Sequence, residues 1–240
     1  MRLARILIVP LIAAALVAST ALPAAAQTSV SLRYWPTNHF TALAGGASAR
    51  TWDAAMISVG LRRDLPNNWG ISFNGDFGSQ TNWAGAWAGA SSGNDSFWNI
   101  NLHRNFPTAN GAFSGFVGYG SAGYGSVFLP ITAAQTRRYN GFRAGADMRF
   151  MTGAWTVMAW GATGIGGTTT TNAPGVSPTA ENTPGTFSEL GATVGFRTAG
   201  GWSIDAGYRS VTFTGGASTT FVASNERWQG WLIGVSRSLP

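Results

Sequence analysis

The connections between the expected strands of this chain alternate between long and short, and this alternation constrains the fold more than any other feature. Transmembrane β-barrels have such an order because one rim carries tight turns and the other carries extended surface loops. A soluble β-sandwich has no reason to sort its connections in this way. The long connections are expected over residues 36–51, 78–95, 125–138, 166–186 and 213–226, and the short ones over residues 64–68, 105–111, 151–154 and 199–201.

The order of the connections predicts an all-β fold. We expect an antiparallel up-and-down transmembrane β-barrel of about ten strands, with eight strands as the alternative. Both ends of the barrel domain are expected at the rim with the short turns. A wide diffusion porin is excluded, because it needs about 16–18 strands.

A secretory signal peptide is expected over residues 1–26, which leaves residues 27–240 for the barrel. Arg2 and Arg5 give a positive start, residues 6–17 are mostly apolar, and Ala24 to Ala26 form a small-residue cleavage site. The apolar stretch is short for a membrane-spanning helix, which needs about 20 residues. We therefore expect export and a location in the bacterial outer membrane.

The composition excludes several classes of protein. Charged residues make up 10% of the chain, which is low for a solvated globule, and 11 tryptophans are too many for a disordered chain. Without Arg2 and Arg5, 13 basic residues stand against 9 acidic ones, a net charge of about +4 with no basic run, so no nucleic-acid partner is expected. The absence of cysteine excludes a thiolate-bound metal, and no cofactor is expected.

Apolar residues alternate with small or polar ones along the expected strands. Side chains on a strand point alternately to opposite faces of the sheet, so this pattern gives each strand one apolar face. In a barrel that crosses a membrane, the apolar face points outward to lipid. One such strand alternates Trp202, Ile204, Ala206 and Tyr208 with Ser203, Asp205 and Gly207.

Aromatic residues gather at the ends of the expected strands. An aromatic residue follows each of the four short turns, namely Trp69, Phe113, Trp155 and Trp202. Two rings of aromatic side chains are typical of the two membrane interfaces. At the rim with the long loops we expect a second set of interface aromatics: Tyr34, Trp35, Trp52, Phe77, Trp98, Tyr139, Phe187, Tyr208 and Trp228.

Charged residues fall on the face that is expected to point into the lumen. An unpaired buried charge is costly, so charges of both signs in a narrow tube must pair or hold water. We expect a bore obstructed by a network of Arg and Asp/Glu side chains. Its expected members are Arg33, Arg62, Asp76, His103, Arg143, Asp147, Arg149, Glu189, Arg197, Asp205 and Arg209.

The sequence gives little support for catalysis, and no enzyme is expected. Residues 89–93 (Gly-Ala-Ser-Ser-Gly) have the spelling of a hydrolase nucleophile elbow, but no helical sequence follows them. A hydrolase at the loop rim would need a histidine beside a carboxylate or serine. His39 with Asp53 or Asp95 is the only conceivable set.

Residues 27–240 resemble the small bacterial outer-membrane barrels, the OmpA-like and opacity-like proteins. The resemblance rests on the signal peptide, the alternation along the strands and the aromatic residues after the short turns. The resemblance implies insertion by the barrel insertion machinery and contact with outer-membrane lipids and lipopolysaccharide. The periplasmic peptidoglycan-binding domain of full OmpA-type proteins is not expected here, because the last strand, residues 228–239, runs to the terminus. Ten strands also resemble the omptin protease barrels, but their paired acidic residues and His–Asp couple find no match here.

Three functions are compatible with these sequence features. The first is a non-enzymatic surface protein of structural or adhesion type, whose long loops bind an extracellular ligand. The second is a narrow gated channel for small solutes, in which the charge pairs of the lumen switch. The third is a hydrolase at the loop rim, which would depend on His39.

Overall fold

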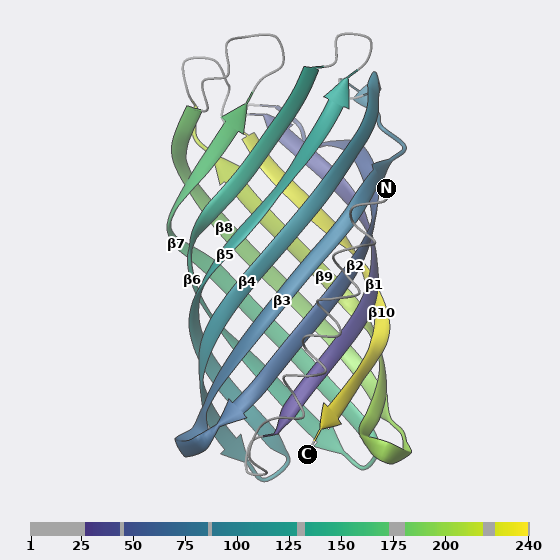
Figure 1. Cartoon of the computed structure of the whole chain (residues 1–240), viewed down its shortest axis with the longest axis vertical. Coiled ribbons are helices and arrows are strands. Elements are labelled where there is room, and N and C mark those ends of the chain that lie inside the picture. The colour runs from purple at the N-terminus through teal and green to yellow at the C-terminus, as the bar shows by residue number, and fades with distance from the viewer. Residues whose placement is uncertain are drawn as a thin grey trace.

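The computed structural model describes residues 27–43, 46–85, 88–128, 133–172, 181–217 and 224–239. Ten antiparallel strands form a closed barrel in which each strand pairs with its neighbours along the chain and β1 pairs with β10 (Figure 1). This confirms the up-and-down barrel with ten rather than eight strands. The strands are β1 (Thr28–Leu43), β2 (Ala49–Leu65), β3 (Trp69–Thr81), β4 (Ala90–Thr108), β5 (Gly111–Phe128), β6 (Ala133–Thr152), β7 (Trp155–Asn172), β8 (Glu181–Arg197), β9 (Trp202–Gly215) and β10 (Ser224–Leu239).

The described residues begin after the expected signal peptide, so that prediction lies outside them. Within them, no helix is long and apolar enough to cross a membrane. Both β1 and β10 reach the lower end of the barrel in Figure 1, which is the end with the short turns. We call this the short-turn end and the opposite one the loop end.

The connections at the short-turn end are tight. Pro66–Asn68 and Ala199–Gly201 each form a single 3-10 turn, and residues 109–110 and 153–154 join the other two strand pairs. Positive φ angles occur in these turns at Asn67 (59°), Asn68 (61°), Gly153 (57°), Gly200 (75°) and Gly201 (77°). Glycine and asparagine are favoured in this left-handed region.

The connections at the loop end are shorter than predicted, because the strands continue into the expected loops. They occupy residues 44–48, 82–89, 129–132, 173–180 and 216–223. The strands are 13 to 20 residues long, whereas about 9–11 residues cross a bilayer. The predicted loop bounds are wrong because the alternation of apolar residues ends where the barrel leaves the lipid, while the hydrogen-bonded ladder goes on.

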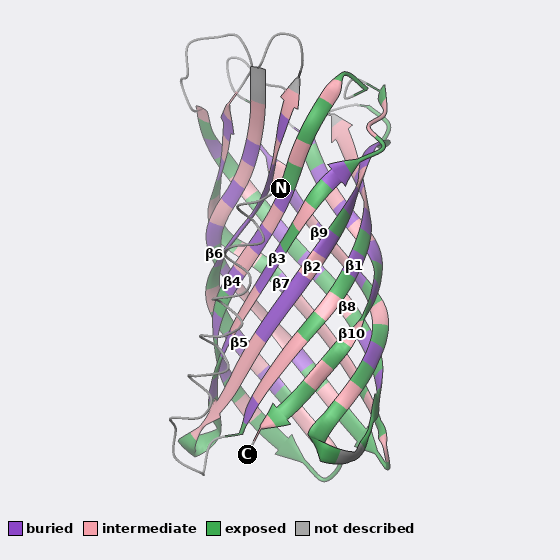
Figure 2. Cartoon of the chain, turned by 45° about the vertical axis from the view of Figure 1, so that its right-hand side comes forward, coloured by how far each residue is buried: buried purple, intermediate pink, exposed green. Residues whose placement is uncertain are grey.

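The two faces of the barrel wall exchange character part-way along the strands. On β9, Trp202, Ile204 and Tyr208 are exposed on the outside. Towards the loop end the outward positions are Ser210, Thr212 and Thr214, and the inward ones are the fully buried Val211 and Phe213. Figure 2 shows the buried and exposed residues alternating along the strands.

Strand β10 shows the same exchange. Trp231 and Ile233 are exposed on the outside, the next outward positions are Gln229 and Arg227, and Trp228 lies fully buried inside. The part of the barrel near the short-turn end therefore has an apolar outside and a polar inside. The part near the loop end is built like a water-soluble protein.

A set of rings, which we call the aromatic core, fills the barrel near the loop end. The ring centroids of Phe213 and Trp228 lie 5.4 Å apart, and those of Tyr139 and Phe187 lie 5.6 Å apart. Offset and edge-to-face contacts of this kind stabilise a core beyond the effect of buried area. The aromatic core consists of Trp35, Trp52, Phe97, Tyr124, Tyr139, Phe187, Phe213 and Trp228.

Small residues make room for the aromatic core. A Cβ atom at Gly141, Gly164 or Gly167 would collide with the Tyr139 side chain. The pairing of β7 with β8 shifts between Thr163 and Gly167, and Gly166 within this shift has φ 60°. The irregularity thus lies where the strand passes the ring of Tyr139 and needs glycine.

The exchange of faces predicts where an outward charge is tolerated. Val194 and Ser188 both point outward from β8, but Val194 lies in the apolar zone and Ser188 beyond it. We expect Val194→Arg to lower the free energy of unfolding by about 2–4 kcal/mol and Ser188→Arg by about 0–1 kcal/mol, because only the first side chain meets lipid. Urea unfolding in lipid vesicles measures both. Equal losses for the two variants would contradict the boundary.

Candidate functional site

A cluster of ion pairs, the upper charge cluster, lies inside the barrel directly below the aromatic core. Arg209 on β9 donates from Nη1 to Asp76 of β3 at 2.8 Å and from Nε to Glu189 of β8 at 2.9 Å. Arg143 on β6 donates to the other oxygen of Glu189 at 2.9 Å, and Trp160 Nε1 donates to this carboxylate at 2.8 Å. Because β3 and β9 lie far apart around the ring, Arg209 connects two separated walls of the lumen.

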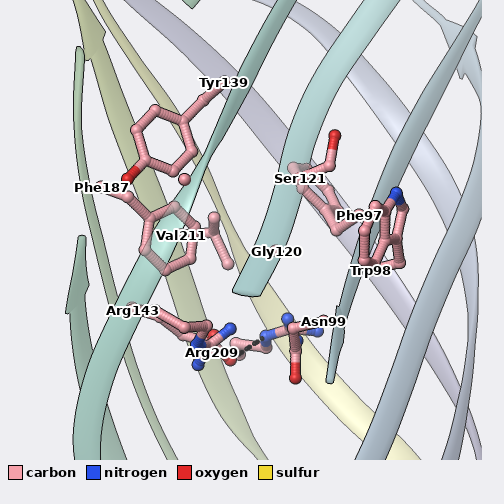
Figure 3. A pocket seen from close by; sticks show the side chains of 12 residues that line it. Phe97, Trp98, Asn99, Gly120, Ser121, Tyr139, Arg143, Phe187, Arg209 and Val211 are labelled. Carbon is pink, nitrogen blue, oxygen red and sulfur yellow. Dashed lines mark hydrogen bonds and ion pairs between the residues drawn. The ribbon is translucent and has the colours of Figure 1, made fainter. Parts of the chain in front are cut away.

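The aromatic core rests on these guanidinium groups. Figure 3 shows Tyr139, Phe187 and Val211 above Arg143 and Arg209. The guanidinium carbon of Arg209 lies 4.5 Å from the ring centroid of Trp35, and that of Arg143 lies 5.3 Å from that of Phe187. Cation–π contacts of this geometry are favourable, and more so when desolvated.

Further ion pairs lie nearer the short-turn end. Arg33 donates to Asp205 at 2.6 Å, and Arg62 donates to Asp147 at 3.1 Å. His103 Nδ1 lies 3.3 Å from the second oxygen of Asp147. Nine of the eleven residues expected in the lumen network thus take part in these pairs and the upper charge cluster.

Arg149 and Arg197, the other two expected members, line the same lumen, and no carboxylate of the described residues lies within ion-pair distance of either. The charges of Asp147 and Asp64 act on Arg149 from a greater distance. The Nη2 atom of Arg197 lies 2.7 Å from the sulfur of Met151.

The free space in the lumen is distributed unevenly. Below the upper charge cluster lies a cavity of about 530 Å³, which we call the lower cavity. Between this cluster and the aromatic core, the gap bounded by Asn99, Tyr139 and Arg143 has about 10 Å³, roughly the space for one water molecule. The wide part of the bore thus ends at the upper charge cluster.

The aromatic residues expected at the membrane interfaces fall into two groups. Tyr34, Trp69, Phe77, Phe113, Trp155, Trp202 and Tyr208 are exposed, and Trp98 is half-buried on the outward face. Their position at lipid interfaces stays a prediction. Trp228 is placed wrongly by the sequence: it is fully buried in the aromatic core. The predicted interface positions of four further aromatics are also wrong, because beyond the lipid zone the apolar residues point inward. These residues are Trp35, Trp52, Tyr139 and Phe187.

A second buried polar cluster, centred on His39, lies among the aromatic rings. The His39 ring stacks on Trp52 with centroids 3.7 Å apart, its Nε2 lies 3.2 Å from Glu226, and its Nδ1 contacts Thr51. Arg137 donates to Glu226 at 3.2 Å.

Asp95 lies in the same region as His39. It accepts hydrogen bonds from Trp52 and Trp228 at 3.1 and 3.0 Å and from Gln80 at 2.8 Å. The sequence pattern did not reveal Glu226 and Arg137, because both fall in expected long loops. The alternation of side chains along a strand would have placed both inside. Arg137 lies an even number of residues from the inward Arg143, and Glu226 lies an odd number of residues from the outward Trp231.

The two buried carboxyls have opposite pKa shifts. Burial raises the pKa of Asp95 above its usual range, against the opposing effects of His39 and the three hydrogen-bond donors. Burial acts in the same direction on Glu226, but the hydrogen bond and charge of His39, together with Ser224 and Arg137, hold the pKa of this carboxyl below its usual range.

This histidine cluster does not have the accessibility that a hydrolase needs. His39 is fully buried beneath aromatic rings, so a substrate cannot reach its nitrogens without displacing them. Asp53, the other expected partner of His39, binds Arg50 and Asn82 instead. Residues 90–93 belong to strand β4 and do not form a strand-to-helix turn. Among the described residues, no three His, Asp or Glu side chains converge to hold a metal ion.

Comparison with known proteins bears out the architecture. The outer membrane protease OmpT from Escherichia coli superposes with a TM-score of 0.60 at 11% identity, covering 92% of this chain and all of that one. The chain has the fold of an outer-membrane β-barrel. At this identity the likeness concerns the fold alone.

Two further structures are more distantly similar. A major outer membrane protein from Thermus thermophilus has a TM-score of 0.41 at 11% identity, over 90% of this chain and 100% of that one. The attachment invasion locus protein Ail of Yersinia pestis has a TM-score of 0.39 at 14% identity, over 89% and 99%. No protein-family model and no curated protein sequence matches the chain.

The opposite pKa shifts of Glu226 and Asp95 predict different effects of neutralising them. The fold favours ionised Glu226, so its contribution to stability is present above the unfolded pKa near 4.5 and is lost as pH falls through the lower folded value. The fold favours protonated Asp95, so its ionisation costs stability at neutral pH, and this cost disappears as pH falls towards 3.8.

We therefore expect Glu226→Gln to lower the free energy of unfolding by about 1–3 kcal/mol near pH 7, and the difference from wild type to shrink below about pH 4. Asp95→Asn removes the buried charge but turns an amide NH2 towards the Gln80 donor, so the variant is expected to be about as stable as wild type near pH 7. Urea unfolding of the refolded protein in vesicles at several pH values measures both. If the two variants lose the same amount at every pH, the assignment of the two carboxyls is wrong.

Proposed function

We propose that this outer-membrane barrel is a closed surface protein of structural or adhesion type, which presents its loop end to molecules outside the cell. The observation that carries the proposal is the filling of the bore. The aromatic core and the upper charge cluster occupy the lumen near the loop end, and the gap between them has about 10 Å³. A barrel filled in this way is a rigid support for what stands on its rim.

The polar outside of the protruding strands supports the same function. Beyond the apolar zone, the outward side chains of β7 to β9 are mostly threonine, serine and asparagine. These strands lift the connections of the loop end away from the lipid surface. Loops held on a rigid scaffold are the usual carriers of binding function.

A narrow gated channel is the alternative, and the lower cavity favours it. Solutes could enter about 530 Å³ of polar space, but to pass they would have to displace both the upper charge cluster and the aromatic core. For catalysis, the burial of His39 argues against a hydrolase at the rim. We therefore propose a protein without enzymatic activity.

Single-channel recording separates the closed barrel from the channel. We expect the wild-type protein in planar bilayers to show no discrete openings. We also expect the Asp147→Asn/Asp205→Asn double variant to stay silent, because both residues lie below the closed part of the bore. A gated conduit would conduct more once these pairs are broken. A diffusion porin in the same bilayer controls for reconstitution, and discrete openings in either protein would contradict a closed bore.

Loop replacement tests the adhesion part of the proposal. Bacteria that display the protein are expected to attach to surfaces coated with extracellular matrix, and to lose this attachment when residues 173–180 and 216–223 are replaced by Gly/Ser segments of equal length. Replacement of residues 109–110 at the short-turn end is the control and should change nothing. Heat-modifiable migration on gels verifies that each barrel is folded. Attachment that survives loop replacement, or that never exceeds that of cells without the protein, would overturn the adhesion function.

A further inference from the structure

The lower cavity has the form of a vestibule that is closed at one end. Its wall reaches the short-turn end at Gln27, Met151, Gly201 and Ser238. Its opposite end is formed by Asp76 and the other members of the upper charge cluster, beyond which the lumen narrows. A volume of about 530 Å³ lies within the usual range of small-molecule sites, about 300–1,000 Å³.

The charges that line this vestibule do not balance. Six arginines face four carboxylates. The arginines are Arg33, Arg62, Arg143, Arg149, Arg197 and Arg209, and the carboxylates are Asp76, Asp147, Glu189 and Asp205. All four carboxylates are engaged by Arg33, Arg62, Arg143 or Arg209. Among the lining residues, the excess of two positive charges therefore falls on Arg149 and Arg197. Asp64 lies outside the lining, 3.5 Å from Arg62, and its charge also acts on Arg149.

These two arginines line the vestibule near its mouth, and Arg197 reaches the strand that carries Arg149. Arg197 is the last residue of β8, and its Nη2 reaches Met151 on β6 at 2.7 Å. Met151 follows Arg149 by two residues on the same inward face of β6. A thioether sulfur is a weak acceptor without charge, so this contact positions the guanidinium group without neutralising it.

The surroundings strengthen the attraction for an anion. A cleft of one charge sign between low-dielectric walls focuses the field and raises the local concentration of counter-ions. Guanidinium groups bind carboxylate and phosphate oxygens in bidentate fashion. Hydroxyl groups that can donate further hydrogen bonds line the same space, namely those of Ser29, Ser31, Thr156, Ser203, Ser236 and Ser238.

We propose that the lower cavity is a binding site for a small anionic solute with carboxylate or phosphate groups, held by Arg149 and Arg197. The solute enters at the short-turn end, which faces the periplasm in an outer-membrane barrel. This site is separate from the surface function proposed above, because the closed part of the bore lies between the two. It stands whether or not the loop end binds a partner.

Isothermal titration of the purified protein in detergent at low ionic strength tests the site, with citrate and inorganic phosphate as the two probes. We expect saturable binding of at least one probe with one site per chain. The Arg149→Gln/Arg197→Gln double variant is expected to bind about a hundredfold or more weakly, because each of the two lost charge-assisted hydrogen bonds contributes about a factor of ten. Binding of citrate alone would assign a carboxylate ligand, and binding of phosphate alone a phosphate ligand.

The matched control is Arg104→Gln/Arg237→Gln. These arginines also lie near the short-turn end, but they are exposed and pack over the outward rings of Trp69 and Trp202. This double variant removes the same net charge and should keep wild-type affinity. Equal weakening by both double variants would show attraction to net charge alone and overturn the site. Absence of saturable binding by folded wild-type protein, judged by heat-modifiable migration, would overturn it as well.

Discussion

The closure of the sheet by pairing β1 with β10 is the constraint on which the rest of the structure depends. This pairing runs from Thr28 opposite Leu239 to Leu43 opposite Ser224 and leaves the barrel without a free edge. A closed ring satisfies the backbone in lipid, where no water can do so. It also encloses an interior of fixed width, so side chains that point inward must fit, pair and exclude or hold water together.

The two parts of the lumen satisfy this condition by different means. Near the short-turn end, charged side chains pair across the lumen around a wide polar cavity. Near the loop end, aromatic rings fill the space, and Asp95 among them accepts hydrogen bonds from Trp52 and Trp228. The upper charge cluster forms the boundary between these two parts of the lumen. There Arg209 donates hydrogen bonds to Glu189 and Asp76, and its guanidinium group lies over the ring of Trp35.

The sequence was sufficient for the barrel, the number of strands and the side of the wall on which most charges lie. These features depend on alternation with period two, which is local. The ends of the strands at the loop rim could not be found in this way, because the apolar residues change faces there and the pattern loses its meaning. Trp228 was therefore placed at the surface, and Glu226 was lost to an expected loop. The sequence also could not predict which charges pair. Arg62 and Asp147, for example, come together only because the closed ring brings β2 and β6 to face each other.

The exchange of faces along the wall means that the two parts of the barrel fold against different surroundings, one against lipid and the other against water. The apolar belt gains its free energy from lipid, whereas the aromatic core gains its free energy by excluding water from a closed ring. The core can become dry only after the strands around it have closed, so its consolidation comes late in assembly. Once formed, it holds the protruding parts of the strands together by contacts inside the barrel, so their packing does not depend on lipid.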